Sequence, residues 1–270
     1  MIIFDIGANR GDWTMKKINT VWRRSGQTGS DEYKNLHIVA VEPGPVAFNK
    51  LKNRITKPMQ NHITIYNCAV SNEEKDINLY ECLNGDGSRG PDSCSTCSVN
   101  HVENSCFGGG EQGQFIMAGG ETFSSHYKFA EPIKVNTISL DKLIDTHGNP
   151  DLIKIDVEGY ENSVLKSLTS KKAKKITFEW HEYNIDQIID SIKYLSKLGY
   201  EYFSTEIWHL GKHEHDSEIL DYKTCSDFIN WLEPIVRKSI ALTGNYDEKA
   251  IIENGKKVPF INIWGMIWVK

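Results

Sequence analysis

The chain has 270 residues, a formal net charge of −5 at pH 7 and six cysteines. Its length suits a single α/β domain with an insertion. Its acidic balance argues against nucleic-acid binding, which needs clustered lysines and arginines to replace phosphate counterions. The sequence has neither a run of about 18 apolar residues nor a secretory signal, so we expect a soluble, cytoplasmic protein without a membrane span.

The first residues combine a buried strand with a glycine turn. Residues 2–6 (IIFDI) form an apolar, β-branched run that predicts a strand covered on both faces, and the run stops at Gly7. Gly7 and Gly11 permit a tight turn, after which Asp12 and Thr14 can cap a helix. Backbone amides and the helix dipole then point into the crevice above the strand end. We therefore expect a site for a small polar or anionic ligand here.

A second predicted strand ends in an acid. The polar stretch 23–35 predicts a surface loop, and residues 37–41 predict a strand that stops at Glu42. A carboxylate at the tip of a strand beside the first one can accept hydrogen bonds from both hydroxyls of a ribose. Residues 46–55 predict an amphipathic helix, and residues 63–66 predict a third strand.

The stretch 82–130 has no clear periodicity and is rich in Gly, Ser and Asn. Such a stretch inside a compact domain predicts a functional lid, a partly ordered insertion, or both. Reduced thiols and a structural zinc site are both open interpretations of its four cysteines, two of which have metal-ligand spacing. These cysteines are Cys82, Cys94, Cys97 and Cys106.

Two acids stand at the end of the fourth predicted core strand. Residues 134–140 predict a shorter strand, after which Asp141 caps a helix. Residues 151–157 (DLIKIDV) predict the core strand, whose end carries Asp156 and Glu158. Alternation puts both carboxylates on one side of the chain, facing the crevice. Because buried carboxylates are costly unless they bind something, we expect a ligand-binding or catalytic role for both.

The fifth predicted strand, residues 176–180, ends beside a histidine. Glu179, His181 and Glu182 form an acid–histidine cluster, which we expect to lie next to the tip of the fourth strand.

The remaining elements complete the sheet. Residues 185–198 predict an amphipathic helix, and residues 201–207 and 262–269 predict an antiparallel hairpin at the sheet edge. Three histidines between those strands predict a solvated loop rather than a metal site; they are His209, His213 and His215.

Five segments together resemble class I S-adenosylmethionine-dependent methyltransferases, and the whole chain is similar to their FkbM-type branch. These segments are FDIGANRGDW (4–13), VAVEPGPVAFNKL (39–51), NCAVSNEEKDINLY (67–80), VNTISLDKLI (135–144) and DLIKIDVEGYENSVLKSL (151–168). The resemblance implies a Rossmann-like fold with a mostly parallel seven-stranded sheet, an antiparallel edge hairpin and helices on both faces. Because the chain begins at its first central strand, we expect either a branch without the usual preceding helix or one domain of a longer polypeptide.

The resemblance also implies a cofactor site and an activity. The cofactor is S-adenosylmethionine, and the activity is methyl transfer to a hydroxyl of a sugar, glycan or polyketide-type small molecule. A sugar or glycan is our preferred acceptor, and glycan-building enzymes are the expected partners. The residues implied to bind the cofactor are Asp5, Gly7, Ala8, Asn9, Gly11, Trp13, Glu42, Pro43, Ala69, Val70 and Asp156.

Two routes to acceptor activation remain open. His181 is the candidate general base, because a histidine titrates near working pH and Glu179 or Glu182 can orient it. Alternatively, Asp156 and Glu158, with His181 as a further ligand, hold a divalent metal that lowers the pKa of the acceptor hydroxyl. Neither route excludes catalysis by alignment alone.

Other functions fit parts of the pattern. A strand, glycine turn and ribose-binding acid also serve nicotinamide-dependent oxidoreductases, but this turn reads GxxxG rather than GxGxxG and no separate catalytic domain follows. A non-catalytic binding module, with the cysteine-bearing stretch as a zinc-held recognition loop, is the third hypothesis.

Overall fold

The computed structural model of the chain describes residues 1–28, 31–73, 75–83, 114–116, 122–124, 128–209, 221–241, 250–253, 256–259 and 263–270. The helices are α1 (Asp12–Thr28), α2 (Pro45–Arg54), α4 (Leu140–His147), α5 (Glu161–Lys166), α6 (Ile185–Lys197) and α7 (Cys225–Ala241), with 3-10 turns at Lys57–Met59 and Glu182–Asn184. The strands of the main sheet are β1 (Ile2–Ile6), β2 (His37–Val41), β3 (Ile63–Tyr66), β12 (Leu152–Ile155), β13 (Ile176–His181), β14 (Tyr202–His209), β15 (Lys223–Thr224) and β18 (Ile263–Val269).

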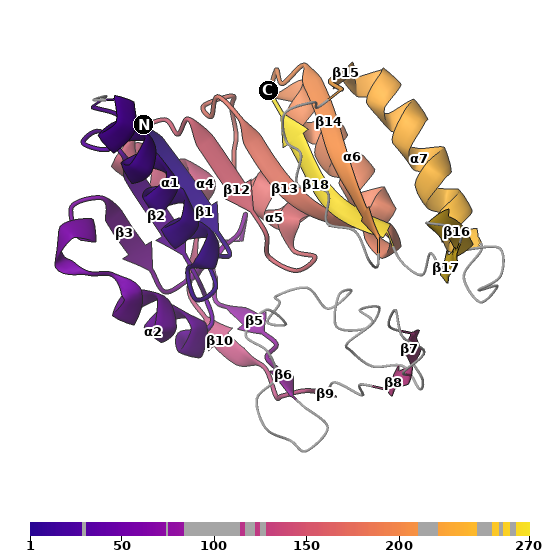
Figure 1. Cartoon of the computed structure of the whole chain (residues 1–270), viewed down its shortest axis with the longest axis horizontal. Coiled ribbons are helices and arrows are strands. Elements are labelled where there is room, and N and C mark those ends of the chain that lie inside the picture. Colours follow the sequence, from indigo (N-terminus) through magenta and orange to yellow (C-terminus); the bar gives the residue numbers. More distant parts are fainter. Residues whose placement is uncertain are drawn as a thin grey trace.

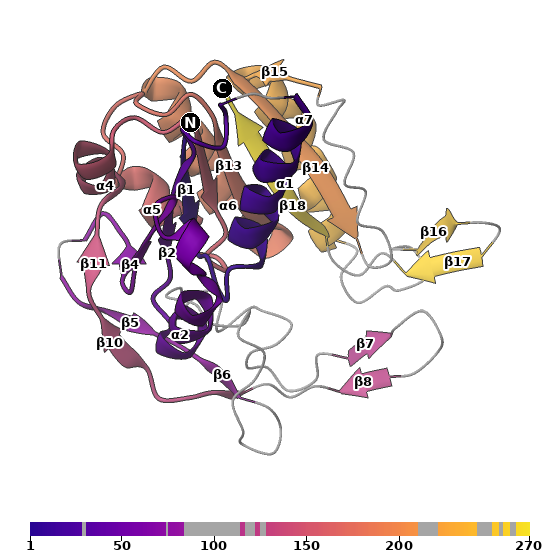
Figure 2. The ribbon, with the colours of Figure 1, turned by 60° about the vertical axis from the view of Figure 1, so that its left-hand side comes forward.

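Shorter strands form separate pairs. They are β4 (Ala69–Val70) with β11 (Thr137–Ile138), β5 (Ile77–Leu79) with β10 (Ile133–Val135), β6 (Cys82–Leu83) with β9 (Lys128–Phe129), β7 (Gln114–Ile116) with β8 (Thr122–Ser124), and β16 (Ala250–Glu253) with β17 (Lys256–Pro259). The pair β5–β10 lies beyond the carboxyl ends of β1 and β2 (Figures 1 and 2).

The main sheet has the order β15-β14-β18-β13-β12-β1-β2-β3. Strands β3, β2, β1, β12 and β13 pair in parallel, whereas β18 pairs antiparallel with both β13 and β14. The predicted seven-stranded sheet with its antiparallel hairpin is therefore confirmed, and the two-residue β15 adds an eighth strand at the edge. The first strand is the central one of the five parallel strands, so its carboxyl end adjoins those of β2 and β12 (Figure 1).

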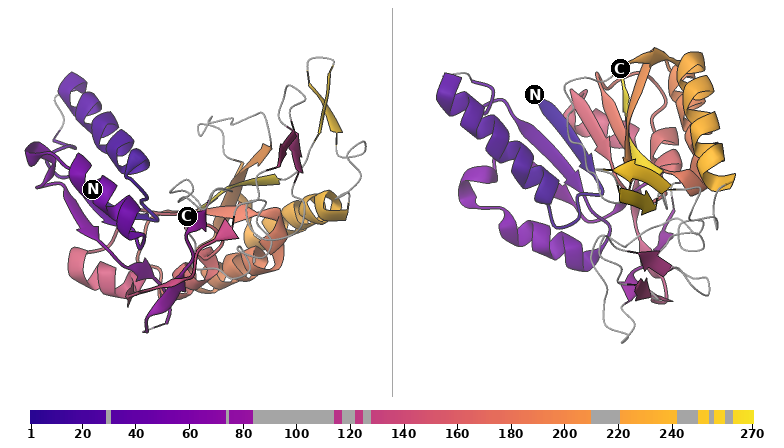
Figure 3. Two further views of the ribbon diagram at one scale, coloured as in Figure 1. Left: turned by 90° about the horizontal axis from the view of Figure 1, so that it is seen from below. Right: turned by 45° about the vertical axis from the view of Figure 1, so that its right-hand side comes forward.

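Alternating residues of the sheet contact helices on its two faces. Ile3 of β1 belongs to a buried cluster that includes residues of α1 and α2, while Phe4 belongs to the cluster on the other face of the sheet, which includes residues of α4, α5, α6 and α7. Figure 3 shows α1 on one side of the sheet and α5 and α6 on the other. Helices on both faces explain why residues 2–6 are apolar on both sides of the strand except at Asp5, since neither face of the strand meets water.

Two helical predictions need correction. Helix α1 continues to Thr28, so part of the predicted loop 23–35 is helical; Ile18 and Val21 anchor this helix on the sheet, and arginines in the following turn are good helix formers. Helix α4 is capped by Ser139, whose hydroxyl accepts a hydrogen bond from the Lys142 amide, and not by Asp141. The Asp141 carboxylate lies in the first turn and binds the amide and hydroxyl of Thr169.

Several predictions fall on residues outside the described part of the chain. Of the four clustered cysteines, the structure describes the backbone of Cys82 in β6, and the other three lie outside, so the zinc interpretation stays a prediction. The same holds for two of the histidines predicted in the loop after β14, since only His209, at the end of that strand, is described.

Candidate active site at the carboxyl ends of the parallel strands

A sharp turn joins β1 to α1. Gly7 has a φ of 78° and Gly11 a φ of 86°, both in the left-handed region that favours glycine. A Cβ atom on Gly7 would lie 1.8 Å from the carbonyl oxygen of Asp156, and one on Gly11 would lie 2.5 Å from Leu51 Cδ1. Position 7 therefore requires glycine, because a side chain there would meet backbone, and position 11 favours glycine through its φ. The amides of Gly7 and Ala8 donate to the Val41 carbonyl at 3.0 Å, which ties the turn to the end of β2.

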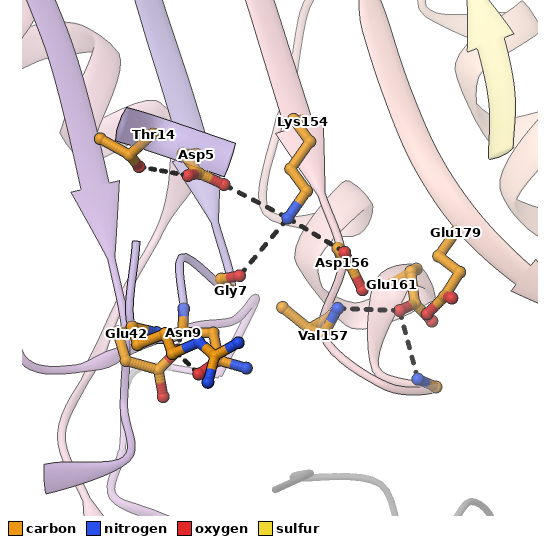
Figure 4. Close-up of polar contacts among 12 residues, drawn as sticks. Asp5, Gly7, Asn9, Thr14, Glu42, Lys154, Asp156, Val157, Glu161 and Glu179 are labelled. Carbon is orange, nitrogen blue, oxygen red and sulfur yellow. Dashed lines mark hydrogen bonds and ion pairs between the residues drawn. The ribbon is translucent and has the colours of Figure 1, made fainter. Parts of the chain in front are cut away.

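Glu42 lies at the end of β2, directly beside this turn. Its two carboxylate oxygens accept hydrogen bonds from the amides of Asn9 and Gly44, each at 2.8 Å. The residue is only 6% exposed, and burial raises the pKa of its carboxyl to about 7 despite these two backbone donors. The predicted ribose acid thus sits at the glycine turn, held in one orientation (Figure 4).

A pocket opens above these strand ends, with about 950 Å³ of empty space including its mouth. Nine of the residues that the sequence assigned to the cofactor line it: Gly7, Ala8, Asn9, Trp13, Glu42, Pro43, Ala69, Val70 and Asp156.

The other two assigned residues, Asp5 and Gly11, lie behind the lining and support it. Asp5 is fully buried within β1, and Gly11 packs against Leu51 of α2. The pocket is also lined by Lys154, Glu158 and Tyr160, among further residues.

Lys154 is the main site residue that the sequence prediction missed. Its ammonium lies 3.3 Å from Asp5, 3.0 Å from Asp156 and 3.4 Å from the Gly7 carbonyl, with only 8% of the side chain exposed (Figure 4). Burial alone lowers the pKa of Lys154, but the carboxylates of Asp156 and Asp5 outweigh it and raise that pKa. Thr14 completes the network by donating its hydroxyl to Asp5 at 2.5 Å.

A usable sequence pattern did point to this network. Asp5 interrupts the apolar run of β1, and Lys154 interrupts that of β12; the two residues are directly paired across the parallel strands. A lone acid and a lone base in adjacent buried strands predict an ion pair, since neither charge is stable there alone.

A second polar cluster occupies the neighbouring strand tips of β12 and β13. His181 Nε2 lies 3.2 Å from Glu179 Oε2, and both side chains are largely buried, at 19% and 12% exposed. Ligand atoms of Glu158, Glu179 and His181 all lie within 4.8 Å of one another. The adjacency predicted for these two strand tips is therefore observed. Glu158 has a φ of 54°, which is uncommon outside glycine.

Burial and crowding set the protonation of this cluster. Burial raises the pKa of Glu179 well above its ordinary value, and the charges of Asp156 and Glu161 add to the effect. Glu179 also hydrogen-bonds Asp156, whose pKa is lowered because Lys154 outweighs burial. Burial lowers the pKa of His181.

Glu161 and Glu182 have different surroundings. Glu161, which the sequence prediction did not single out, is 1% exposed and accepts hydrogen bonds from the amides of Val157 and Gly159 at 3.1 and 3.2 Å. Glu182 accepts hydrogen bonds from the Ser239 hydroxyl at 2.6 Å and the Ile263 amide at 3.4 Å. Glu179, at 3.2 Å, is thus the better placed of the two predicted partners to orient His181.

Comparison with known proteins places this geometry in context. The model of the methyltransferase FkbM domain matches residues 5–202. The search of curated proteins gave no match.

Among solved structures, the chain is similar to precorrin-6y C5,15-methyltransferase from Geobacter metallireducens, with 9% identity and a TM-score of 0.39 over 100% of this chain and 78% of that one. It is also similar to the YcgJ protein from Bacillus subtilis, with 8% identity and a TM-score of 0.40 over 99% and 90%. A third is the plantazolicin methyltransferase BpumL in complex with SAH, with 10% identity and a TM-score of 0.33 over 100% and 76%.

Proposed function

Because the chain belongs to the methyltransferase FkbM family, we propose that it transfers a methyl group from S-adenosylmethionine to a hydroxyl of a polyhydroxylated small molecule, most simply a sugar or glycan. The observation that carries this proposal is the pocket between the glycine turn and Glu42, lined by nine of the residues assigned to the cofactor from the sequence.

The lining fits the parts of this cofactor. Gly7 lets the backbone approach the end of β12 without a side chain between them. Glu42 presents carboxylate oxygens for the ribose hydroxyls, and Ala69 and Val70 offer a small apolar surface for the adenine ring. Asp156, on the same pocket wall, supplies negative charge for the positively charged methionine end.

Methyl transfer needs alignment and removal of one proton. S-adenosylmethionine supplies a methyl carbon whose bond to sulfur breaks, leaving the electron pair on sulfur, as the acceptor oxygen forms its bond to that carbon. The chain holds the acceptor oxygen in line and takes up or displaces its proton. Asp156 and Glu158 face the pocket, and Glu179 and His181 lie beside them, so we assign the proton step to this cluster.

Two chemistries are available to the cluster. In one, His181 accepts the proton while Glu179, 3.2 Å away, orients its imidazole. In the other, a divalent cation held by Glu158 or Asp156 together with His181 lowers the pKa of the hydroxyl. Removal of divalent ions with a chelator separates them, because only the second loses turnover.

The acceptor class follows from chemistry at the same place. Carboxylates and an imidazole clustered at the pocket suit a substrate with several hydroxyl donors, which favours a sugar or glycan. We propose that the protein works in the cytoplasm alongside enzymes that build such molecules. None of the helices in the described residues is long and apolar enough to cross a membrane.

Isothermal titration tests the proposal directly. S-adenosylmethionine and its demethylated product should each bind once per chain, and NAD should not bind. Binding of NAD in their place would support a nicotinamide-dependent oxidoreductase. A folded protein that binds none of the three would support a non-catalytic module. Incubation with labelled S-adenosylmethionine and a panel of sugars then tests for a labelled O-methyl product.

A further inference from the structure

We propose that Glu158, Glu179 and His181 bind one divalent metal ion at the adjoining tips of β12 and β13. One potential ligand atom from each residue lies within 4.8 Å of the others. Ligands bound at about 2.0–2.2 Å to one ion are separated by at most about 4.4 Å. The three side chains therefore need only a small movement to share an ion.

The backbone supplies these ligands from two adjoining segments. Glu179 and His181 are the fourth and sixth residues of β13, so alternation puts their side chains on the same side of that strand. Glu158 comes from the turn after β12, which pairs in parallel with β13. The three ligands therefore come from two separate backbone segments that strand pairing holds side by side.

A separate buried carboxylate also indicates a cation here. Glu161 is 1% exposed, and its Oε1 holds the turn through the amides of Val157 and Gly159. Its Oε2 is buried and accepts no hydrogen bond within the described residues. Figure 4 shows this carboxyl beside that of Glu179. An acceptor with no donor in such a place is costly, and a metal ion or an ion-bound water would satisfy it.

The nearby lysine does not meet this need. Lys154 is placed between Asp5 and Asp156, at 3.3 and 3.0 Å, so a single positive charge already serves two carboxylates. Glu158, Glu161 and Glu179 lie beyond that pair. A bound dication would stabilise the ionised forms of these carboxylates without a second buried lysine.

The ligand types indicate which ions fit. One imidazole with two carboxylates favours a transition-metal ion such as Mn²⁺, Fe²⁺ or Zn²⁺ over Ca²⁺, which prefers oxygen ligands alone. Three protein ligands leave coordination positions open. Glu158 lines the main pocket, so those positions face the cofactor side. Two neighbouring hydroxyls of the acceptor then occupy the open coordination positions, a step that rests on the proposed function.

Binding of Mn²⁺ tests the site without any assay of activity. The full chain is stripped with a chelator and titrated with Mn²⁺ while electron paramagnetic resonance follows the free ion. About one Mn²⁺ per chain should bind, and Glu158→Gln and Glu179→Gln should each weaken binding by about tenfold or more. Mn²⁺ is preferred as the probe because thiolate sites, such as one formed by the clustered cysteines, select softer ions.

Glu201→Gln is the matched control, since Glu201 is exposed and precedes β14 at the opposite end of the sheet. Its Mn²⁺ affinity should equal that of the parent. Pulsed resonance on the bound ion should also show coupling to an imidazole nitrogen, and His181→Gln should abolish it. This measurement stays informative if one glutamate variant folds poorly.

Two results would overturn the proposal: no Mn²⁺ binding at millimolar concentration by a chain with an intact thermal transition, or binding unchanged in all three ligand variants. Failure of the methyltransferase proposal looks different, because the chain would then bind Mn²⁺ but neither S-adenosylmethionine nor its product.

Discussion

The effect of Glu42→Gln on the free energy of unfolding should change sign as pH rises. The carboxyl has an ordinary pKa of 4.5 and titrates near pH 7 when folded, chiefly because it is buried. Between pH 4.5 and pH 7 the folded state therefore keeps a proton on Glu42 that the unfolded state has lost. The contribution of this proton to the free energy of unfolding is complete below pH 4.5 and is lost as pH rises through 7. Between pH 5 and pH 8.5 the loss is on the order of 2–3 kcal/mol.

Glutamine cannot ionise, so Glu42→Gln escapes this loss. Its amide can accept only one of the two backbone hydrogen bonds that now come from Asn9 and Gly44, which costs about 1 kcal/mol at every pH. The variant should thus be about 1 kcal/mol less stable than the parent near pH 5 and more stable by about 1–2 kcal/mol at pH 8.5.

Urea denaturation of both proteins at pH 5, 6, 7 and 8.5 measures this difference, and all other titrating groups cancel between them. A parent-minus-variant difference that stays flat over this range, or that grows in favour of the parent at high pH, would refute the assigned ionisation of Glu42.

Substitutions at four residues probe the site further. Gly7→Ala puts a Cβ 1.8 Å from the Asp156 carbonyl at a φ of 78°, so we expect a loss of about 3 kcal/mol or more in unfolding free energy and of cofactor binding, measured by urea melts and calorimetry; parent-like values would show that the turn can relax. Lys154→Met leaves the buried Asp5 carboxylate and the partly exposed Asp156 carboxylate without their counter-charge and should cost about 3–5 kcal/mol, with Lys154→Arg recovering part of it; an unchanged urea midpoint in Lys154→Met would contradict the ion-pair network. Glu42→Ala should weaken cofactor binding about tenfold or more with a smaller change in kcat, whereas His181→Ala should lower kcat about 10²-fold or more and leave cofactor affinity nearly unchanged; intact turnover in His181→Ala would remove His181 from the proton step.

The predictable parts of the fold are those where the local sequence pattern agrees with the burial and backbone angles that tertiary packing imposes. Residues 2–6 read as a strand because both faces of β1 are buried, and the glycines after it read as a turn because their positive φ angles favour glycine. The carboxyl ends of parallel strands meet at one edge, so placing Glu42 and Asp156 at strand tips was enough to bring them to one pocket.

The missed features depend on partners distant in sequence. The role of Lys154 is evident only once it is known to pair with Asp5, which lies 149 positions earlier in the chain and opposite it across the β1–β12 pairing. Helix α7 was not predicted, although its buried residues Phe228, Leu232 and Val236 recur every four positions. The capping of α4 by Ser139 rather than Asp141 was a choice between two good caps, which side-chain partners such as Thr169 decide.

The close packing of Gly7 on the Asp156 carbonyl has a further implication for how such an enzyme could diversify. There is no space for even one methyl group between these strand tips, so the segments that we propose to bind the methyl donor and to take up the acceptor's proton pack directly against each other. New acceptor preferences would then arise most readily from substitutions outside these strand tips, because almost any substitution within them would alter donor affinity and turnover together.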